Sequence, residues 1–318
     1  MKYSDINILM LTVKEIPDYL QDSIYYGLVK LGCNVVDYPR RKSLHGSWAN
    51  PEYSVNQLLF NFPETALKKD PDIMIVAGMY GNYRPYNSFD AWHKFIMKTL
   101  MEYNPAKLIM LDAEDSRECH YPMLDRPYDA VFKRELFYQP YGNWFNINFS
   151  AIPEPFTFVP YTLREYDVSF VATISNDYRI EVRNFLKQRC NDLGLSAFIH
   201  VEKEPLDRSE YLRILSQSKT SVSVRGAGVD CYRYWEIPSR GVVMISDDHG
   251  LPIKNDFAPN HIFKFKNLED LDAILRAVKE RPDILEDMAL ESLRHSHKFH
   301  TPEKRAMKIL KEIFPNVS

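Results

Sequence analysis

The chain repeats one pattern, in which a short, continuous apolar run is followed by a segment with apolar residues three or four apart. In the first half the apolar runs are Asn7–Leu11, Asp72–Gly78 and Lys107–Asp115, and helical periodicity appears in Asp18–Gly32 and Ser88–Tyr103. Strands that are apolar on both faces are typical of parallel sheets with helices on both sides. The pattern therefore predicts an α/β fold.

A proline-containing stretch interrupts the pattern at Ser150–Thr162, and the alternation restarts at Tyr166–Thr173. A length of 318 residues fits two domains. We expect two Rossmann-like domains, residues 1–155 and 156–300, that face each other across a cleft. Open parallel sheets bind ligands at the carboxyl ends of their strands, so both sheets are expected to contribute residues to that cleft.

Composition excludes several classes of protein. The net charge of −3 argues against a general nucleic-acid binder, which normally has a large basic excess. The four cysteines are isolated from one another, so neither a zinc site nor a disulfide framework is predicted. No apolar run approaches the roughly 20 residues of a membrane span. We expect a cytoplasmic protein.

The segment Ser223–Asp248 runs from a basic turn into an aromatic helix and then an apolar strand. Gly226 and Gly228 are expected to adopt positive φ and let the backbone approach a ligand. Arg225 and Arg233 offer charge-assisted hydrogen bonds to a diphosphate. The carboxylate of Glu236 is able to accept two hydrogen bonds from a vicinal diol such as ribose. The alternative is a surface pair between Arg233 and Glu236, three residues apart on a helix.

Tyr232–Asp248 resembles the donor-site motif of GT-B glycosyltransferases, and most closely the group 1 subgroup related to spore-maturation glycosyltransferases. The matching places are Arg233, Trp235, Glu236, Ser239, Gly241 and Asp247. Val168–Leu186 resembles the first strand and loop of the family's second domain, and His297–Ile313 resembles its C-terminal helix. The first domain matches only the general Rossmann pattern.

The resemblance implies a glycosyltransferase that moves a sugar from a nucleoside-diphosphate sugar to a glycan, lipid-linked or protein acceptor, with no metal and no further cofactor. Glu236 would hold the donor ribose, and Arg233 would neutralise the departing diphosphate. Residues 301–318 would form a helix that packs back toward the N-terminal domain. The complete set of expected donor-binding residues is Thr173, Arg225, Gly226, Gly228, Tyr232, Arg233, Glu236 and Ser239.

The chain also departs from the family pattern. Ala172 stands where the family usually has a glycine after the first strand of this domain. Gly228 stands where many relatives carry a second glutamate. The diphosphate contacts are therefore expected from Arg225, Arg233 or Thr173.

An inverting transferase needs a carboxylate or histidine that takes the acceptor proton. Asp112, Glu114 and Asp115 follow an apolar strand and are our catalytic candidates, although an acidic solvated turn would have the same sequence. His120, in the same loop, is a weaker candidate.

Gly78, Tyr80 and His45 are predicted to contact the acceptor. Gly78 and Tyr80 leave a strand end, where an ordinary turn is the alternative. His45 closes a basic stretch that begins at Arg40 and suits an acceptor, an anionic lipid surface or plain solvation. His295 and His297, two residues apart on a helix, do not share a face, so we expect no metal site there.

Two other functions remain open. A sugar-nucleotide epimerase or hydrolase could use the same fold. A two-domain nucleotide- or sugar-binding protein would need no catalytic carboxylate or histidine facing the donor sugar.

Overall fold

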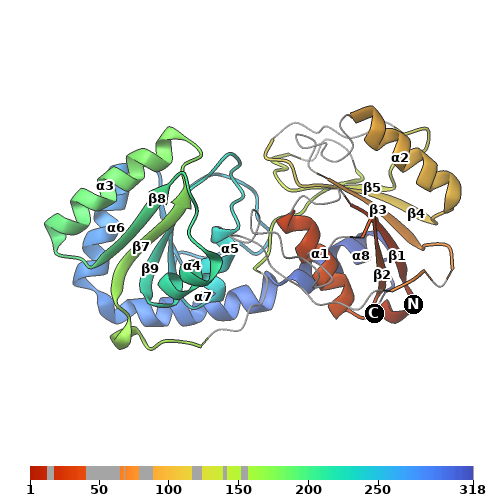
Figure 1. Ribbon diagram of the computed structural model, residues 1–318. Coiled ribbons are helices and arrows are strands. Elements are labelled where there is room, and N and C mark those ends of the chain that lie inside the picture. Colours follow the sequence, from red (N-terminus) through yellow and green to blue (C-terminus); the bar gives the residue numbers. More distant parts are fainter. Residues whose placement is uncertain are drawn as a thin grey trace. The chain divides into compact units, whose positions relative to one another are not determined.

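The computed structural model describes residues 1–12, 18–40, 65–67, 69–78, 89–116, 124–138, 142–151 and 157–317 (Figure 1). These residues divide into two compact units. The described parts of Met1–Ala49, Gln57–Ser150 and Pro302–Ser318 form the first unit, and those of Ala151–Thr301 belong to the second. No helix in the described residues is both long enough and apolar enough to cross a membrane.

The first unit contains a parallel sheet with the strand order β2-β1-β3-β4-β5-β6. Its strands are β1 (Asn7–Leu11), β2 (Asn34–Tyr38), β3 (Ile73–Gly78), β4 (Lys107–Asp112), β5 (Ala130–Lys133) and β6 (Trp144–Asn146). Its helices are α1 (Tyr19–Lys30), α2 (Phe89–Glu102) and the C-terminal α8 (Pro302–Ile313). The core strands β1, β3 and β4 are apolar on both faces and buried, as the sequence pattern predicts.

Helix α8 joins the first unit by packing on α1. A Cβ atom added at Gly27 of α1 would lie 2.2 Å from the carbonyl oxygen of Pro302, so only glycine permits this approach. The Arg305 Nε atom also donates hydrogen bonds of 3.1 Å to the carbonyls of Asn148 and Phe149, which follow β6. Both contacts hold the last helix against the first unit.

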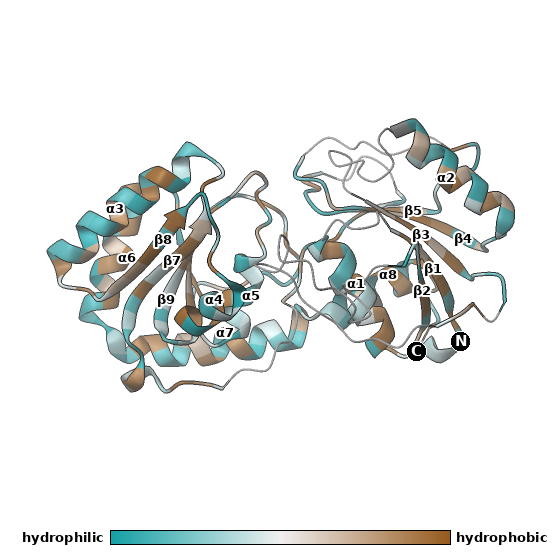
Figure 2. Cartoon of the chain, viewed as in Figure 1, coloured by the Kyte–Doolittle hydropathy of each residue, from teal (hydrophilic) through white to brown (hydrophobic). Residues whose placement is uncertain are grey.

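The second unit contains a parallel sheet with the order β11-β10-β9-β7-β8. Its strands are β7 (Tyr166–Thr173), β8 (Ala197–Glu202), β9 (Ser218–Ser223), β10 (Val243–Asp247) and β11 (Phe263–Phe265). Its helices are α3 (Asp177–Leu193), α4 (Arg208–Ser216), α5 (Arg233–Ser239), α6 (Leu268–Glu280) and α7 (Leu285–Phe299). Figure 2 shows apolar residues along the strands of both sheets and polar residues over much of the surrounding helices.

Local sequence signals set the ends of α3. The Asn176 side chain accepts a hydrogen bond of 3.0 Å from the backbone N–H of Arg179, and Gly194 ends the helix at φ 63°. The two Rossmann-like domains predicted from the sequence are confirmed. The short strands β6 and β11 were not predicted from the sequence.

Candidate functional site

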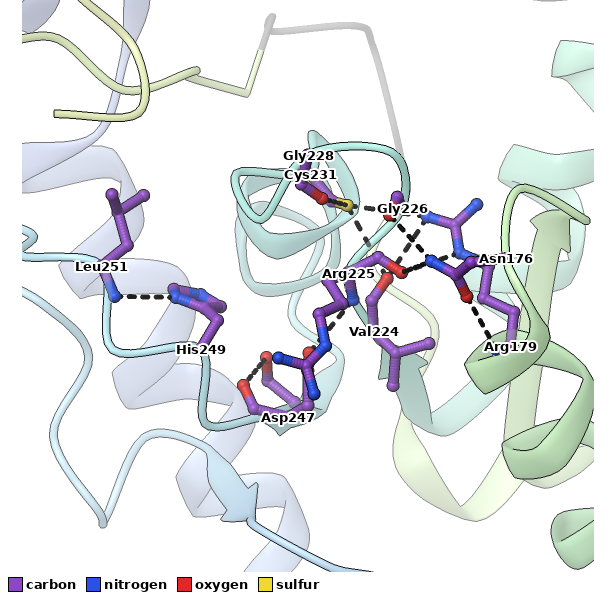
Figure 3. A network of polar contacts seen from close by, with 11 residues as sticks. Asn176, Arg179, Val224, Arg225, Gly226, Gly228, Cys231, Asp247, His249 and Leu251 are labelled. Atoms are coloured by element: carbon purple, nitrogen blue, oxygen red, sulfur yellow. Dashed lines mark hydrogen bonds and ion pairs between the residues drawn. The ribbon is translucent and has the colours of Figure 1, made fainter. Parts of the chain in front are cut away.

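At the carboxyl edge of the second sheet, Thr173 ends β7. Arg225 beyond β9 and Asp247 at the end of β10 lie at the same edge (Figure 3). The buried Arg179 of α3 connects the first two of these segments. Its Nη1 atom donates to the Thr173 carbonyl at 2.8 Å, and its Nε atom donates to the Arg225 carbonyl at 3.1 Å. This edge is where parallel sheets bind their ligands.

Arg179 also fixes the loop that follows β9. Its Nη2 atom donates to the Val224 carbonyl at 3.3 Å, and the neighbouring Asn176 Nδ2 atom donates to the Gly226 carbonyl at 2.7 Å (Figure 3). Burial, helped by the charge of Arg233, lowers the pKa of Arg179 to about 10, so the guanidinium stays charged near neutral pH. Arg179 was not among the predicted site residues, although it lies in the segment that carries the resemblance.

The absence of a side chain at Gly226 leaves room for the guanidinium of Arg179. A Cβ atom at this position would lie 2.5 Å from the Arg179 Nη2 atom. The Gly226 N–H donates to the Gly228 carbonyl at 2.8 Å and closes a tight turn. The prediction that Gly226 and Gly228 adopt positive φ is wrong, because neither is among the positive-φ glycines of the described residues.

Arg225 and Asp247 form an ion pair at this edge. The backbone N–H of Arg225 donates to Asp247 Oδ1 at 3.1 Å, and the Nε atom lies 3.3 Å from Oδ2. The guanidinium also lies over the Tyr178 ring, 4.9 Å from its centroid. Burial raises the pKa of Asp247 to about 6, and the charge of Arg225 opposes this rise. The Arg225 side chain itself is 46% exposed.

Arg233, the first residue of α5, is only 9% exposed. Its Nε and Nη2 atoms are buried without a hydrogen-bond partner in the part of the chain that the structure describes. A buried charge without an acceptor is costly. The arrangement therefore suits an anionic ligand that supplies the missing acceptors.

Glu236 is buried one turn further along α5, and helix α4 holds its carboxylate. Arg208 Nη2 donates to Oε1 at 2.9 Å, and the Tyr211 hydroxyl donates to Oε2 at 3.0 Å. Burial raises the pKa of Tyr211 well above its usual value, so its hydroxyl remains a donor. Because Arg233 and Glu236 are both buried, the alternative of a surface pair does not hold.

The remaining predicted donor residues have smaller roles in the geometry. Tyr232 precedes α5 and is 37% exposed. The Ser239 hydroxyl donates to the Glu236 carbonyl at 2.8 Å inside α5. His249, beyond β10, was not among the predicted residues; it accepts a hydrogen bond of 3.1 Å from the Leu251 N–H at Nδ1 (Figure 3). Burial lowers the pKa of His249 to about 4, so its imidazole is neutral near neutral pH.

The acidic candidates of the first unit lie at the end of β4. Asp112 is buried opposite Lys133 of β5, whose Nζ atom lies 3.0 Å from Asp112 Oδ2. Its Oδ1 atom accepts from the Glu114 N–H at 2.9 Å, and burial raises the pKa of the carboxyl. Asp115 pairs with Arg134 but is 39% exposed, the most open of the three.

The predicted acceptor residues are only partly described. Gly78 ends β3 and lies in register with Asp112 of β4. Tyr80 and His45 lie outside the described residues, as does His120. Among the residues that the structure describes, no group of three or more His, Cys, Asp or Glu side chains is arranged to hold a metal ion.

Comparison with known proteins finds a similarity to one family over part of the chain. Residues 182–311, less than half of the chain, match a family model described as "Glycosyl transferase-like". This match runs from α3 through α5, with Arg233 and Glu236, to α8. No curated protein sequence matches the chain.

The fold is similar to that of solved transferases. An alpha-glucosyltransferase in complex with UDP has 9% identity and a TM-score of 0.62 over 98% of this chain and 100% of its own. A sucrose-phosphate synthase from Thermosynechococcus elongatus has 8% identity and a TM-score of 0.57 over 98% and 99%. A glycosyltransferase from Rickettsia africae has 10% identity and a TM-score of 0.56 over the same shares. The two-domain GT-B fold expected from the sequence is confirmed.

Proposed function

We propose that this protein is a glycosyltransferase that moves a sugar from a nucleoside-diphosphate sugar to an acceptor hydroxyl, because residues 182–311 match a glycosyl transferase-like family model and the chain has the GT-B fold. Similar solved structures include an alpha-glucosyltransferase with UDP and another with UDP-glucose and DNA. The observation in this chain that carries the proposal is the buried guanidinium of Arg233, whose Nε and Nη2 atoms have no acceptor in the described residues.

In this proposal the donor diphosphate binds between Arg233 and Arg225. Two oxygen atoms of a phosphate match the planar fork of a guanidinium, so Arg233 gains the hydrogen bonds that it lacks. Arg179 keeps its hydrogen bonds to the loop carbonyls and adds positive charge behind the site. The charge on the leaving diphosphate grows as the glycosidic bond breaks, and fixed guanidinium groups stabilise that charge without a metal ion.

Glu236 is proposed to hold the ribose of the donor. A carboxylate has about four acceptor positions, and in this proposal the ribose hydroxyls donate to Glu236 beside the hydrogen bonds that it accepts from Arg208 and Tyr211 of α4. The contacts with Arg208 and Tyr211 fix the orientation of the carboxylate before a ligand arrives. A fixed acceptor loses less entropy when it binds a diol.

The base that takes the acceptor proton is proposed among Asp112, Glu114 and Asp115. Asp115 is the best placed of these, because it is partly exposed at a strand end, whereas Asp112 is buried against Lys133. Gly78, at the neighbouring strand end, and Tyr80 and His45 are proposed to contact the acceptor.

A glycan, lipid-linked sugar or protein is the acceptor that we propose, with the enzyme in the cytoplasm. Some of the similar alpha-glucosyltransferase structures contain DNA. The net charge of −3 in this chain favours an acceptor other than nucleic acid. A lipid-linked acceptor would bring the enzyme to the membrane surface.

A binding panel followed by a turnover assay tests the function. UDP-glucose, UDP-N-acetylglucosamine, GDP-mannose and ADP-glucose are first screened for a rise in melting temperature, since a ligand of the folded state stabilises it. The stabilising donor is then incubated with a mixture of oligosaccharide and lipid-linked acceptors, and release of the nucleoside diphosphate is measured. We expect release that increases with acceptor.

Other results identify the alternatives. Conversion of the sugar nucleotide without an acceptor would indicate an epimerase or hydrolase, and binding without turnover would indicate a binding protein. If no donor in the panel binds, the glycosyltransferase proposal is wrong.

A further inference from the structure

We propose that Asp247 competes with the donor diphosphate for the guanidinium of Arg225 and thereby limits the affinity of the site. The inference rests on the proposed function of the second unit. The carboxylate takes the place of a ligand anion while the site is empty, and a bound donor draws Arg225 away from it.

The contacts of the pair suit such an exchange. Asp247 is buried, but its Oδ2 atom has no hydrogen-bond partner among the described residues. The ion pair of this atom with Arg225 Nε has a distance of 3.3 Å (Figure 3). The Oδ1 atom is held separately by the backbone N–H of Arg225. Because nearly half of the Arg225 side chain is exposed, the guanidinium is able to turn toward a ligand while the loop backbone stays in place.

The surroundings of Asp247 offer no equal replacement for Arg225. Arg179 of α3 affects the Asp247 carboxylate through its positive charge. The N–H groups of Arg179 donate instead to the carbonyls of Thr173, Val224 and Arg225, and Nη2 also approaches the Cys231 sulfur. Tyr178 of α3 is uncharged, with its pKa raised by burial, and His249 beyond β10 is neutral. The exposed Asp248 adds a like charge on the same segment.

Donor binding is therefore expected to be coupled to the uptake of a proton by Asp247. Burial raises the pKa of Asp247 to about 6. Loss of Arg225 and arrival of the diphosphate charge both disfavour the ionised carboxylate, so they raise this pKa further. Between the two pKa values the bound state holds one more proton than the free state. Donor affinity must then fall as pH rises through this window above about 6.

Calorimetry with a sugar nucleotide tests the coupling. The ligand is the sugar nucleotide that binds best in the panel above. A sugar nucleotide is used in place of a free nucleoside diphosphate because the terminal phosphate of the diphosphate ionises near pH 6 and would itself exchange a proton. Titrations near neutral pH in two buffers of different ionisation enthalpy measure proton uptake. The wild type is expected to take up a fraction of a proton. Asp247→Asn should bind about three- to tenfold more tightly, with no proton uptake.

Asp248→Asn is the matched control. It removes the same charge from the next residue, which is exposed and does not contact Arg225 in the described structure. Its affinity and proton uptake should stay within about twofold of the wild type.

The outcomes separate the proposals. Weaker or unchanged donor binding by a folded Asp247→Asn variant would overturn the inference and show that the carboxylate orients Arg225 or is inert. If the variant does not fold, the wild type decides, because an affinity that is independent of pH between about 6 and about 8 excludes the coupling. Failure of the wild type to bind any sugar nucleotide refutes the proposed function instead.

Discussion

Arg233 and Asp112 are both buried charged residues, but their surroundings give them different roles. Asp112 has a cation at 3.0 Å and a backbone donor at 2.9 Å, so its charge is balanced within the first unit. Arg233 has two buried N–H-bearing atoms without acceptors in the described structure. The first arrangement is balanced within the fold, whereas a ligand anion completes the second in our proposal.

Replacement of the acidic residues separates structural from catalytic roles. Asp112→Ala leaves Lys133 buried without its carboxylate, and we expect the free energy of unfolding to fall by about 3–5 kcal/mol. Asp115→Ala should cost less, because Asp115 is itself 39% exposed and its buried partner Arg134 keeps Glu135, whose Oε1 atom lies 3.2 Å from Nη1. If Asp115 is the base, its removal should lower turnover at least about 100-fold with donor affinity unchanged. Urea unfolding and steady-state kinetics measure these effects.

Equal stability of the Asp112→Ala protein and the wild type would refute the structural role of the buried pair. Full activity of Asp115→Ala would remove this residue from the mechanism.

At the scale of elements, α4 and α5 act together through Glu236. Tyr211→Phe removes one donor to the carboxylate and keeps the ring, so the orientation of Glu236 should loosen while the fold is preserved. If Glu236 holds ribose, affinity for a nucleoside and for its diphosphate should fall by the same factor, about three- to tenfold. Calorimetry with both ligands measures the two factors.

Arg213→Ala is the control within the same helix, because Arg213 is half exposed and pairs with Glu210. It should change neither affinity. A loss confined to the diphosphate in Tyr211→Phe would contradict the ribose assignment.

The elements also show what the sequence could predict. Long buried strands such as β1 and β4 stand out because both faces are apolar, and α3 is marked by Asn176 and Gly194 at its ends. The three-residue strands β6 and β11 are too short to show a period. Their places are set by pairing with β5 and β10, which local sequence does not encode.

Site contacts were predictable only in part. Arg225 and Arg233 were identified as cations near a strand end, and both lie at that edge or in the following helix. Arg179 and Arg208 were missed because their partners are distant in sequence. Arg179 contacts Arg225, 46 residues away, and Arg208 contacts Glu236, 28 residues away. The sequence also did not explain why residue 226 is a glycine. Any larger side chain there would collide with Arg179, which lies on a distant segment of the chain.

At the scale of the whole molecule, two Rossmann-like units divide the chain, and α8 returns to the first unit after the second is complete. The family match covers most of the second unit, where the proposed donor site lies, and continues into α8. The acidic candidates lie in the first unit. This division suits a transferase, in which donor and acceptor are separate molecules.

The central claim is that the second unit binds a nucleoside diphosphate through Arg233, and calorimetry on Arg233→Ala tests it most directly. Because a hydrogen bond to a charged group contributes about 1.5–3 kcal/mol, diphosphate affinity should fall about 10- to 150-fold, whereas affinity for the bare nucleoside should barely change. Arg213→Ala, which removes an exposed arginine, should bind both ligands as the wild type does. Undiminished diphosphate affinity in folded Arg233→Ala protein would contradict the account.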